Sequence, residues 1–254
     1  MFVDMVRSHP TRWAIGVSIF ALVVCAGQVW PHLTASRAPT SLRTVDLSHV
    51  VHERVPYLIG EPPTQLVRDG AGQLTQVTLG THTGSFLRVM TAPESDLATV
   101  ETLSPHDLVL SAIVIDARDQ AQDQPTFTLS VADVLAWERT HGLIPPGALV
   151  LLTTGWDVRW GDAAAYLHAG ADGTLQVPGF APAAADLLLN QRKVAGLGAD
   201  APATAYTPAT GFALWLANLT NLEQLPPTGA TIVIGALKLQ AAASSPARVF
   251  ALVP

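Results

Sequence analysis

The sequence predicts an α/β domain with a mixed sheet over residues 44–254. Short apolar runs that are typical of buried strands alternate along the chain with segments of helical periodicity. Hydrophobic residues make up 49% of the 254 residues and charged residues only 13%, a composition that supplies a large core and excludes a disordered chain. A segment of this length fits a single domain.

The expected elements follow in chain order. Buried strands are predicted at Leu108–Ile115 and Ala148–Thr153, where Val, Ile and Leu dominate. A helix is predicted at Ser130–Thr140, with Ser130 as N-cap ahead of Asp133 and an apolar face formed by Val131, Val134, Leu135 and Trp137. The remaining elements are a helix at Ala181–Asn190 and strands at Val194–Leu197, Thr231–Ile234 and Arg248–Val253.

Residues 1–43 are expected to lie outside this domain. A basic flank, residues 1–12, precedes residues 13–30, which carry no charged side chain, and residues 31–43 form a linker. As a helix, residues 13–30 would span about 27 Å, close to the thickness of a bilayer core. The basic flank places the following chain outside the cytoplasm. We therefore expect export, periplasmic or extracellular, by a cleaved signal peptide or an uncleaved membrane anchor; a buried core helix is the alternative.

Charge and cysteine content exclude several classes of function. The net charge of −6 has no basic cluster behind it, so nucleic acid is not an expected partner, and membrane contact is expected only through the N-terminal segment. The single cysteine, Cys25, lies in the apolar run. The domain therefore has neither a disulfide nor a cysteine nucleophile.

The segment Leu79–Arg88, L-G-T-H-T-G-S-F-L-R, resembles a metal-binding motif of the cyclase family, H-x-G-T-H-x-D-x-P-x-H. That family includes the bacterial kynurenine formamidases and isatin hydrolase. Further segments resemble the family in the same order: Asp46–His49, Pro146–Trp156, Pro178–Phe180, Gly198–Asp200, Asn218–Pro227 and Pro246–Val249. The resemblance runs from Thr44 to the C-terminus and implies the swivelling β/β/α-type fold of the family.

The resemblance also implies a catalytic zinc or manganese ion, but this chain lacks most of the ligands. The family's metal-binding positions in the motif are occupied by Thr78, His82 and Gly84, and the glutamate of its E-N-L element falls on Ala217. No histidine lies between Asp200 and Ala217. Since a catalytic metal needs about three converging protein ligands, we expect no bound metal and no other cofactor.

His82 is the candidate catalytic residue, as a general base or ligand anchor; the alternative is a structural histidine bonded to a nearby backbone group. Thr78 and His82 could pair a nucleophile with a base, but Gly84 leaves no carboxylate to orient the histidine. Arg88 replaces the family's last histidine and either holds a carboxylate or is a strand residue that faces solvent. Trp156 either lines the pocket that corresponds to the family's metal site or packs in the core. Thr78, Arg88 and Trp156 are the candidate binding-pocket residues.

Two further expectations concern the rest of the chain. The family's G-G-S-G loop corresponds to Ala241–Ser244, and the loss of glycine predicts a changed loop shape. The other histidines singled out lack ligand spacing and are expected on the surface or in loops: His49, His52, His106, His141 and His168.

Together these observations predict a cyclase-family pseudoenzyme that binds a small organic anion, with an aromatic carboxylate as the expected ligand. The alternative is a hydrolase of non-peptide C–N amide bonds, similar to an arylformamidase or lactam hydrolase, that uses other ligands or no metal. A purely structural or interaction role is the third interpretation. The family commonly forms dimers or tetramers, so the resemblance implies a homo-oligomer.

Overall fold

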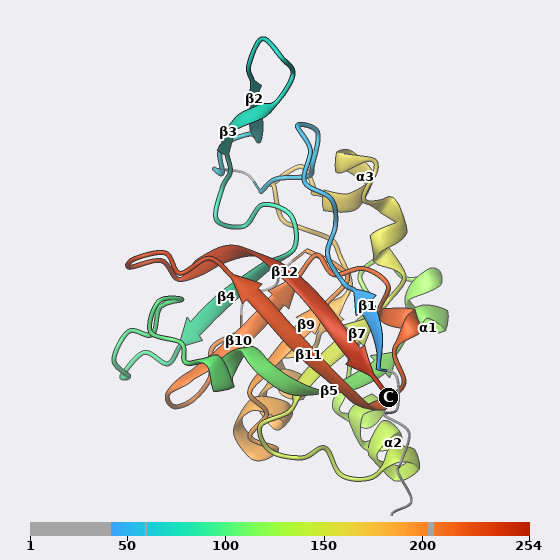
Figure 1. The fold of residues 1–254 in the computed structure, drawn as a ribbon. Helices are drawn as coiled ribbons and strands as arrows, with labels where there is room; N and C mark the ends of the chain where they lie inside the picture. Colours follow the sequence, from blue (N-terminus) through green and yellow to red (C-terminus); the bar gives the residue numbers. More distant parts are fainter. Residues whose placement is uncertain (1–41, 59, 203–205) are drawn as a thin grey trace, which may run out of the picture. The chain divides into compact units, whose positions relative to one another are not determined.

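Eight strands form one mixed sheet that closes on itself into a barrel (Figure 1). The computed structural model describes residues 42–58, 60–202 and 206–254. In sheet order the strands are β1 (Arg43–Asp46), β12 (Ser244–Val253), β11 (Thr228–Ala236), β5 (Val109–Asp116), β7 (Leu149–Thr153), β9 (Gly196–Ala199), β10 (Phe212–Ala217) and β4 (Phe86–Thr91). Because β12 also pairs with β4, the sheet is closed and β1 is added beside β12. The predicted α/β class and mixed sheet are confirmed.

Parallel and antiparallel pairs occupy different parts of the barrel. Parallel pairs join β5 to β7, β7 to β9 and β9 to β10. Antiparallel pairs join β11 to β5 and β12, and β4 to β10 and β12. β4 therefore lies between β10 and β12, although about 120 residues or more separate it from each along the chain.

Alternation of side chains along the strands divides the core into two clusters. On β10, Leu214 and Leu216 belong to the inner cluster, whereas Trp215 and Ala217 belong to the outer one. On β4, the inner residues are Leu87 and Val89, and the outer ones are Phe86 and Met90. By the same alternation, Arg88 lies on the outer face.

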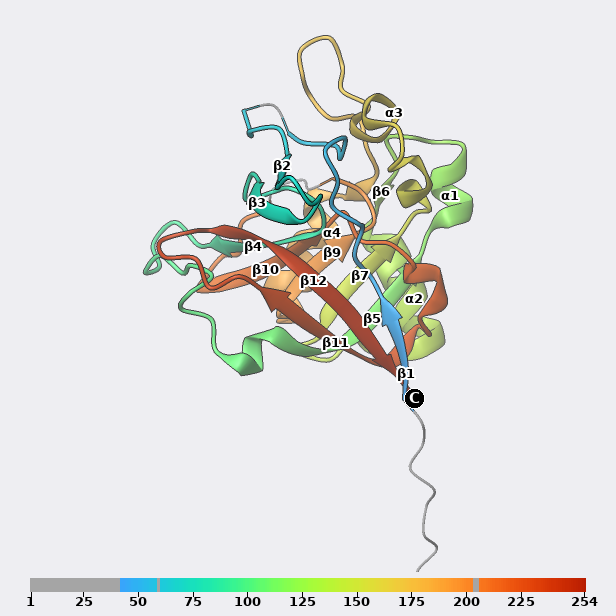
Figure 2. The same cartoon turned by 45° about the horizontal axis from the view of Figure 1, so that its top comes forward.

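Helices cover part of the outer face (Figure 2). In α2 (Val131–His141), the Ser130 N-cap accepts a hydrogen bond from the Asp133 backbone N–H at 3.3 Å, as predicted. Trp137 Nε1 donates to the carbonyl of Val114 on β5 at 3.0 Å, which fixes the helix over the sheet. Leu135 was expected on the packed face but is 38% exposed, because α2 buries a narrower stripe centred on Val134.

The smaller elements lie between the main strands. The helices are α1 (Arg118–Gln122), α3 (Ala163–Leu167) and α4 (Pro182–Asp186), with a π-helix at Leu187–Gln191 and 3-10 turns at Pro105–Leu108, Trp156–Arg159 and Leu222–Gln224. Two small sheets pair β2 (Gln65–Arg68) with β3 (Leu74–Thr78), and β6 (Thr128–Leu129) with β8 (Gly179–Phe180).

Each strand and helix predicted in the domain is present, and most boundaries move by no more than two residues. The exceptions are β11 and β12, which begin three and four residues early, and the second helix, which is divided into α4 and the π-helix that follows it. The predicted basic flank, apolar segment and most of the linker lie outside the described residues. Within residues 42–58, 60–202 and 206–254, no helix is long and apolar enough to cross a membrane.

Candidate functional site

His82 lies in the turn between β3 and β4, and both of its ring nitrogens have side-chain partners. Nδ1 lies 2.6 Å from Oε1 of Glu61, and Nε2 lies 2.9 Å from Oγ of Ser244. Edge-on packing against Phe86, at 4.9 Å between ring centroids, holds the plane of the imidazole. The expectation of a histidine bonded to a backbone group is therefore wrong, because a carboxylate and a hydroxyl take both nitrogens.

A glycine of the motif makes the contact with Glu61 feasible. A β-carbon at Gly80 would lie 1.8 Å from Oε2 of Glu61. The side chains of His82 and Glu61 are 23% and 19% exposed, so solvent only partly screens the contact. Glu61 is the orienting carboxylate that Gly84 had seemed to remove, and it comes from a loop outside the motif.

Ser244 is held beside His82 by the closure of the barrel. It is the first residue of β12 and is buried, with 3% of its surface exposed. In the pairing of β12 with β4, Ser244 lies directly opposite Arg88. Directly opposed residues point to the same face of a sheet with Cβ atoms about 4.5–5.5 Å apart. Ser244 and Arg88 are thus neighbours on the outer face.

Arg88 is half-buried and lies between two notable neighbours. Trp215 of β10 is opposite Arg88 on the other side of β4. Its indole Nε1 is buried and has no hydrogen-bond partner in the described part of the chain. No carboxylate among the described residues forms an ion pair with Arg88. The row Ser244–Arg88–Trp215 therefore combines a hydroxyl, an uncompensated cation and an aromatic residue.

A buried polar network supports the turn that carries His82. Asn218 adopts a positive φ of 55°, which asparagine tolerates better than most residues. Its Nδ2 donates to the Gly84 carbonyl at 2.6 Å, and its Oδ1 accepts from the Tyr166 hydroxyl at 3.0 Å. Together with His82 and Phe86, Asn218 and Tyr166 line a cavity of about 10 Å³. This volume is close to the minimum for one water molecule.

Asp200 supports the same buried polar network. Its carboxylate accepts hydrogen bonds from the Thr154 backbone and hydroxyl and from the Gly155 backbone, at 2.6–2.7 Å. Burial nevertheless raises the pKa of Asp200 to about 6, because desolvation of the charged form exceeds the effect of these hydrogen bonds. The arrangement ties the T-G-W segment to the G-x-D segment, which accounts for both segments structurally.

The residues at the family's ligand positions do not fit a divalent metal. Thr78 ends β3 in the small sheet, Gly84 adopts a φ of +70°, and Ala217 is fully buried. The lone pair and the proton of His82 are both engaged by side chains. No group of three or more His, Cys, Asp or Glu side chains that could hold a metal ion occurs within the described ranges.

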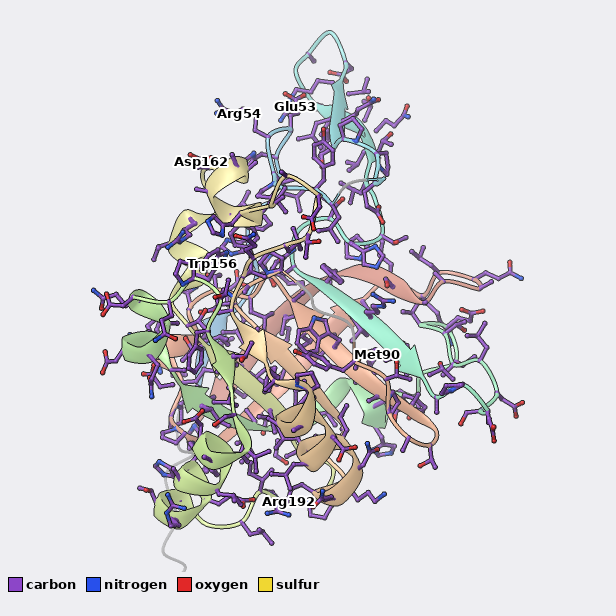
Figure 3. The ribbon with its side chains drawn as sticks, turned by 180° about the vertical axis from the view of Figure 1, so that it is seen from behind. Glu53, Arg54, Met90, Trp156, Asp162 and Arg192 are labelled. Atoms are coloured by element: carbon purple, nitrogen blue, oxygen red, sulfur yellow. The ribbon has the colours of Figure 1, made fainter. Side chains whose placement is uncertain are left out.

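Trp156 does not join this site. It is buried, donates from Nε1 to the Tyr166 carbonyl at 2.8 Å, and carries the Arg159 guanidinium 4.0 Å above its ring. In Figure 3, Trp156 lies toward Asp162 and α3, well apart from Met90 on β4. Thr78 likewise forms no hydrogen bond with His82 in the described structure. Of the predicted pocket residues, only Arg88 is brought beside the partners of His82.

His49 lies in a loop after β1, as expected, and its ring stacks on the buried Trp160, with 4.1 Å between the ring centroids. Burial lowers the pKa of His49 to about 4, and nearby Asp157 only partly opposes this shift. Its Nε2 has no partner among the described atoms. The stacked pair is a structural feature that no local pattern in the sequence indicates.

The two residues that sequence reasoning missed are Glu61 and Ser244. Glu61 lies 21 positions before His82, and Ser244 lies 162 positions after it. A signal existed for Ser244, which is the only hydroxyl residue in the loop Ala241–Ser244. For Glu61, the only signal was the glycine at position 80. That this glycine makes room for the Glu61 side chain is visible only in the structure.

The closed mixed barrel that carries the G-T-H turn between β3 and β4 is also the fold of the isatin hydrolases, to which this chain is similar. The family model described as "Putative cyclase" matches residues 45–206, so the chain belongs to the cyclase family. It is 32% identical over 196 residues to isatin hydrolase of Roseibium aggregatum, covering 70% of this chain and 74% of that protein.

Solved structures agree with this assignment. Isatin hydrolase A from Ralstonia solanacearum superposes with a TM-score of 0.75 and 31% identity, covering 84% of this chain and 92% of that chain. An isatin hydrolase bound to the product analogue thioisatinate gives a TM-score of 0.76 and 28% identity, covering 84% and 93%.

Proposed function

We propose that this chain binds a small organic anion on the outer face of the barrel without the metal of its family. It would thus be a pseudoenzyme with respect to metal-dependent hydrolysis. The observation that carries the proposal is the half-buried Arg88, which has no ion-pair partner among the described residues and lies between Ser244 and Trp215.

The chemistry of these neighbours favours an aromatic carboxylate. A guanidinium can bind both carboxylate oxygens through parallel N–H groups. The indole of Trp215 is buried, so it provides apolar packing beside Arg88 rather than an open surface for the ligand. The solved relative that holds thioisatinate supports the same ligand class, since it is described as a product analogue of isatin hydrolysis.

Calorimetric titration of the purified chain with benzoate and anthranilate, with and without a chelator, tests the proposal. We expect weak binding that the chelator leaves unchanged. Arg88→Ala should abolish binding without a loss of thermal stability, and Arg88→Lys should retain part of it. Arg159→Ala, which removes a guanidinium elsewhere on the surface, is the matched control. Binding unaffected by Arg88→Ala, or stoichiometric metal in the purified protein, would overturn the proposal.

A further inference from the structure

We propose that Glu61, His82 and Ser244 form a metal-independent acyl-transfer site. This inference rests on the proposed metal-free site and deepens it. A hydroxyl within hydrogen-bond reach of an imidazole, which is oriented in turn by a carboxylate, is the arrangement that activates a serine nucleophile. Here the distances are 2.9 Å from Ser244 to His82 and 2.6 Å from His82 to Glu61.

The two contacts use different nitrogens of one ring, which assigns a role to each residue. A carboxylate only accepts hydrogen bonds when ionised, so the proton of His82 lies on Nδ1 and is donated to Glu61. Nε2 then carries the lone pair and accepts from the Ser244 hydroxyl. This tautomer, which follows from the hydrogen-bond network, is the one a general base requires.

Arg88 provides the electrostatic complement. It lies opposite Ser244 in the register of β12 and β4, on the same face of the sheet. When Ser244 attacks a carbonyl carbon, negative charge develops on the carbonyl oxygen. The guanidinium of Arg88 beside that oxygen stabilises the charge.

The confined space selects the acyl group. Ser244 is 3% exposed, and the cavity beside His82 has about 10 Å³. This space is too small to hold an acyl group, so a substrate must reach Ser244 from outside the cavity, and only a compact acyl group of one or two carbons is expected to react. The cavity itself offers a place for one water molecule next to the imidazole.

The reaction balances without a metal or a redox partner. Ser244 Oγ bonds to the acyl carbon while its proton passes to His82 Nε2. The C–N or C–O bond of the substrate then breaks, and the leaving amine or alcohol takes that proton. Water next attacks the acyl-serine, gives one proton to His82, and the proton returns to Ser244 as the carboxylic acid leaves.

Incubation of the full chain with p-nitrophenyl acetate in the presence of a chelator, followed by peptide mass spectrometry, tests this site. We expect p-nitrophenol release and one acetyl group on the peptide that contains Ser244. Ser244→Ala should abolish the label, whereas His82→Gln should slow acetylation roughly 100-fold or more. Glu61→Gln should slow it at least about 10-fold and leave the thermal melting curve nearly unchanged.

Ser245→Ala is the matched control. Ser245 is equally buried but pairs with Leu87, whose side chain lies in the inner cluster, so it faces away from His82. Its removal should leave acetylation of Ser244 intact. A label on another residue, no label at all, or a rate that does not depend on His82 would overturn the inference.

The two proposals fail separately. Carboxylate binding that depends on Arg88, in a protein that cannot be acetylated, would refute the acyl-transfer site and leave anion binding intact. Acetylation of Ser244 in a protein whose carboxylate binding does not depend on Arg88 would refute the anion-binding proposal and leave the acyl-transfer site intact. ¹⁵N NMR of His82 gives a readout besides activity: a proton on Nε2 rather than Nδ1 would also refute the assigned roles.

Discussion

The carboxylate of Glu61 occupies the space in which a β-carbon at Gly80 would lie. A Cβ atom at position 80 would come within 1.8 Å of Oε2 of Glu61 and 2.8 Å of its carboxyl carbon. The glycine of the G-T-H motif thus has a role here that does not depend on metal: it admits the carboxylate that holds His82.

Gly80→Ala should therefore separate the carboxylate from the imidazole. Glu61 is the end of a flexible side chain and can swing away, so we expect the domain to stay folded while acetylation of Ser244 falls to the level of Glu61→Gln. Gly161→Ala is the control, since a β-carbon there meets nothing within 4 Å. Unchanged acetylation in Gly80→Ala would show that the contact with Glu61 has no role in catalysis.

His49 should make the folded state sensitive to acid. Its pKa is about 4 in the folded protein and 6.5 without burial, so the unfolded chain binds the proton first as the pH falls. The contribution of neutral His49 to the free energy of unfolding is fully present above about pH 6.5 and is lost as the pH falls toward 4. We expect a loss of about 2 kcal/mol, after allowance for partial solvent exposure.

Denaturant unfolding at pH 7 and pH 4.5 measures this effect. His49→Phe keeps an aromatic ring against Trp160 and should reduce the loss, whereas His106→Gln, at an exposed position, should not. Asp200 contributes with the opposite sign, because its raised pKa favours the folded state as the pH falls from 6 toward 4. An identical acid loss in the His49→Phe variant would contradict the prediction.

Ala241 adopts a φ of 55°, in the left-handed region that disfavours residues with a β-carbon. The loss of glycine from this loop predicted a changed shape, yet at this position alanine takes a backbone conformation typical of glycine. Ala241→Gly should stabilise the domain by about 1 kcal/mol, equivalent to a rise in Tm of roughly 2–4 °C. Ala243→Gly, which only adds chain flexibility in the unfolded state, should lower the Tm. The same direction for both variants would argue against strain at Ala241.

Residues 13–30 should carry the chain across a membrane, because they are long, uncharged and preceded by arginines. A fusion of residues 1–40 to a reporter that is active only in the periplasm should be active. Replacement of Leu22 by Arg, which places a charge in the apolar run, should abolish that activity. Reporter protein found only in the cytoplasm would rule out export.

The strands were predictable where both faces are buried. All of Leu149–Thr153 is buried, as is the Ala112–Ile115 part of β5, and these stretches read as apolar runs because parallel strands covered on both sides contain few polar residues. β4 does not follow from the apolar pattern, because Arg88 interrupts it, and a strand at Arg88 is only the alternative interpretation of that residue. The Ser130 cap was predictable because its partner, Asp133, lies three residues away.

The site depended on a different kind of information. His82 was found from its motif, but Glu61 and Ser244 reach it through the turn after β3 and the closure of the barrel. Neither contact leaves a periodic or spaced pattern in the chain. The loss of the family's metal ligands is visible in the sequence. The partners that His82 has instead, Glu61 and Ser244, are visible only in the structure.

Closure of the barrel by β12 has a consequence for the timing of reactivity during folding. Ser244 begins the strand whose pairing with β4 completes the ring, whereas Glu61 and His82 belong to the first third of the chain. The nucleophile consequently meets its base only when the last strand docks. Chains in which β12 has not yet paired with β4 would not be acetylated at Ser244, so the appearance of acetylation during refolding would report the docking of β12.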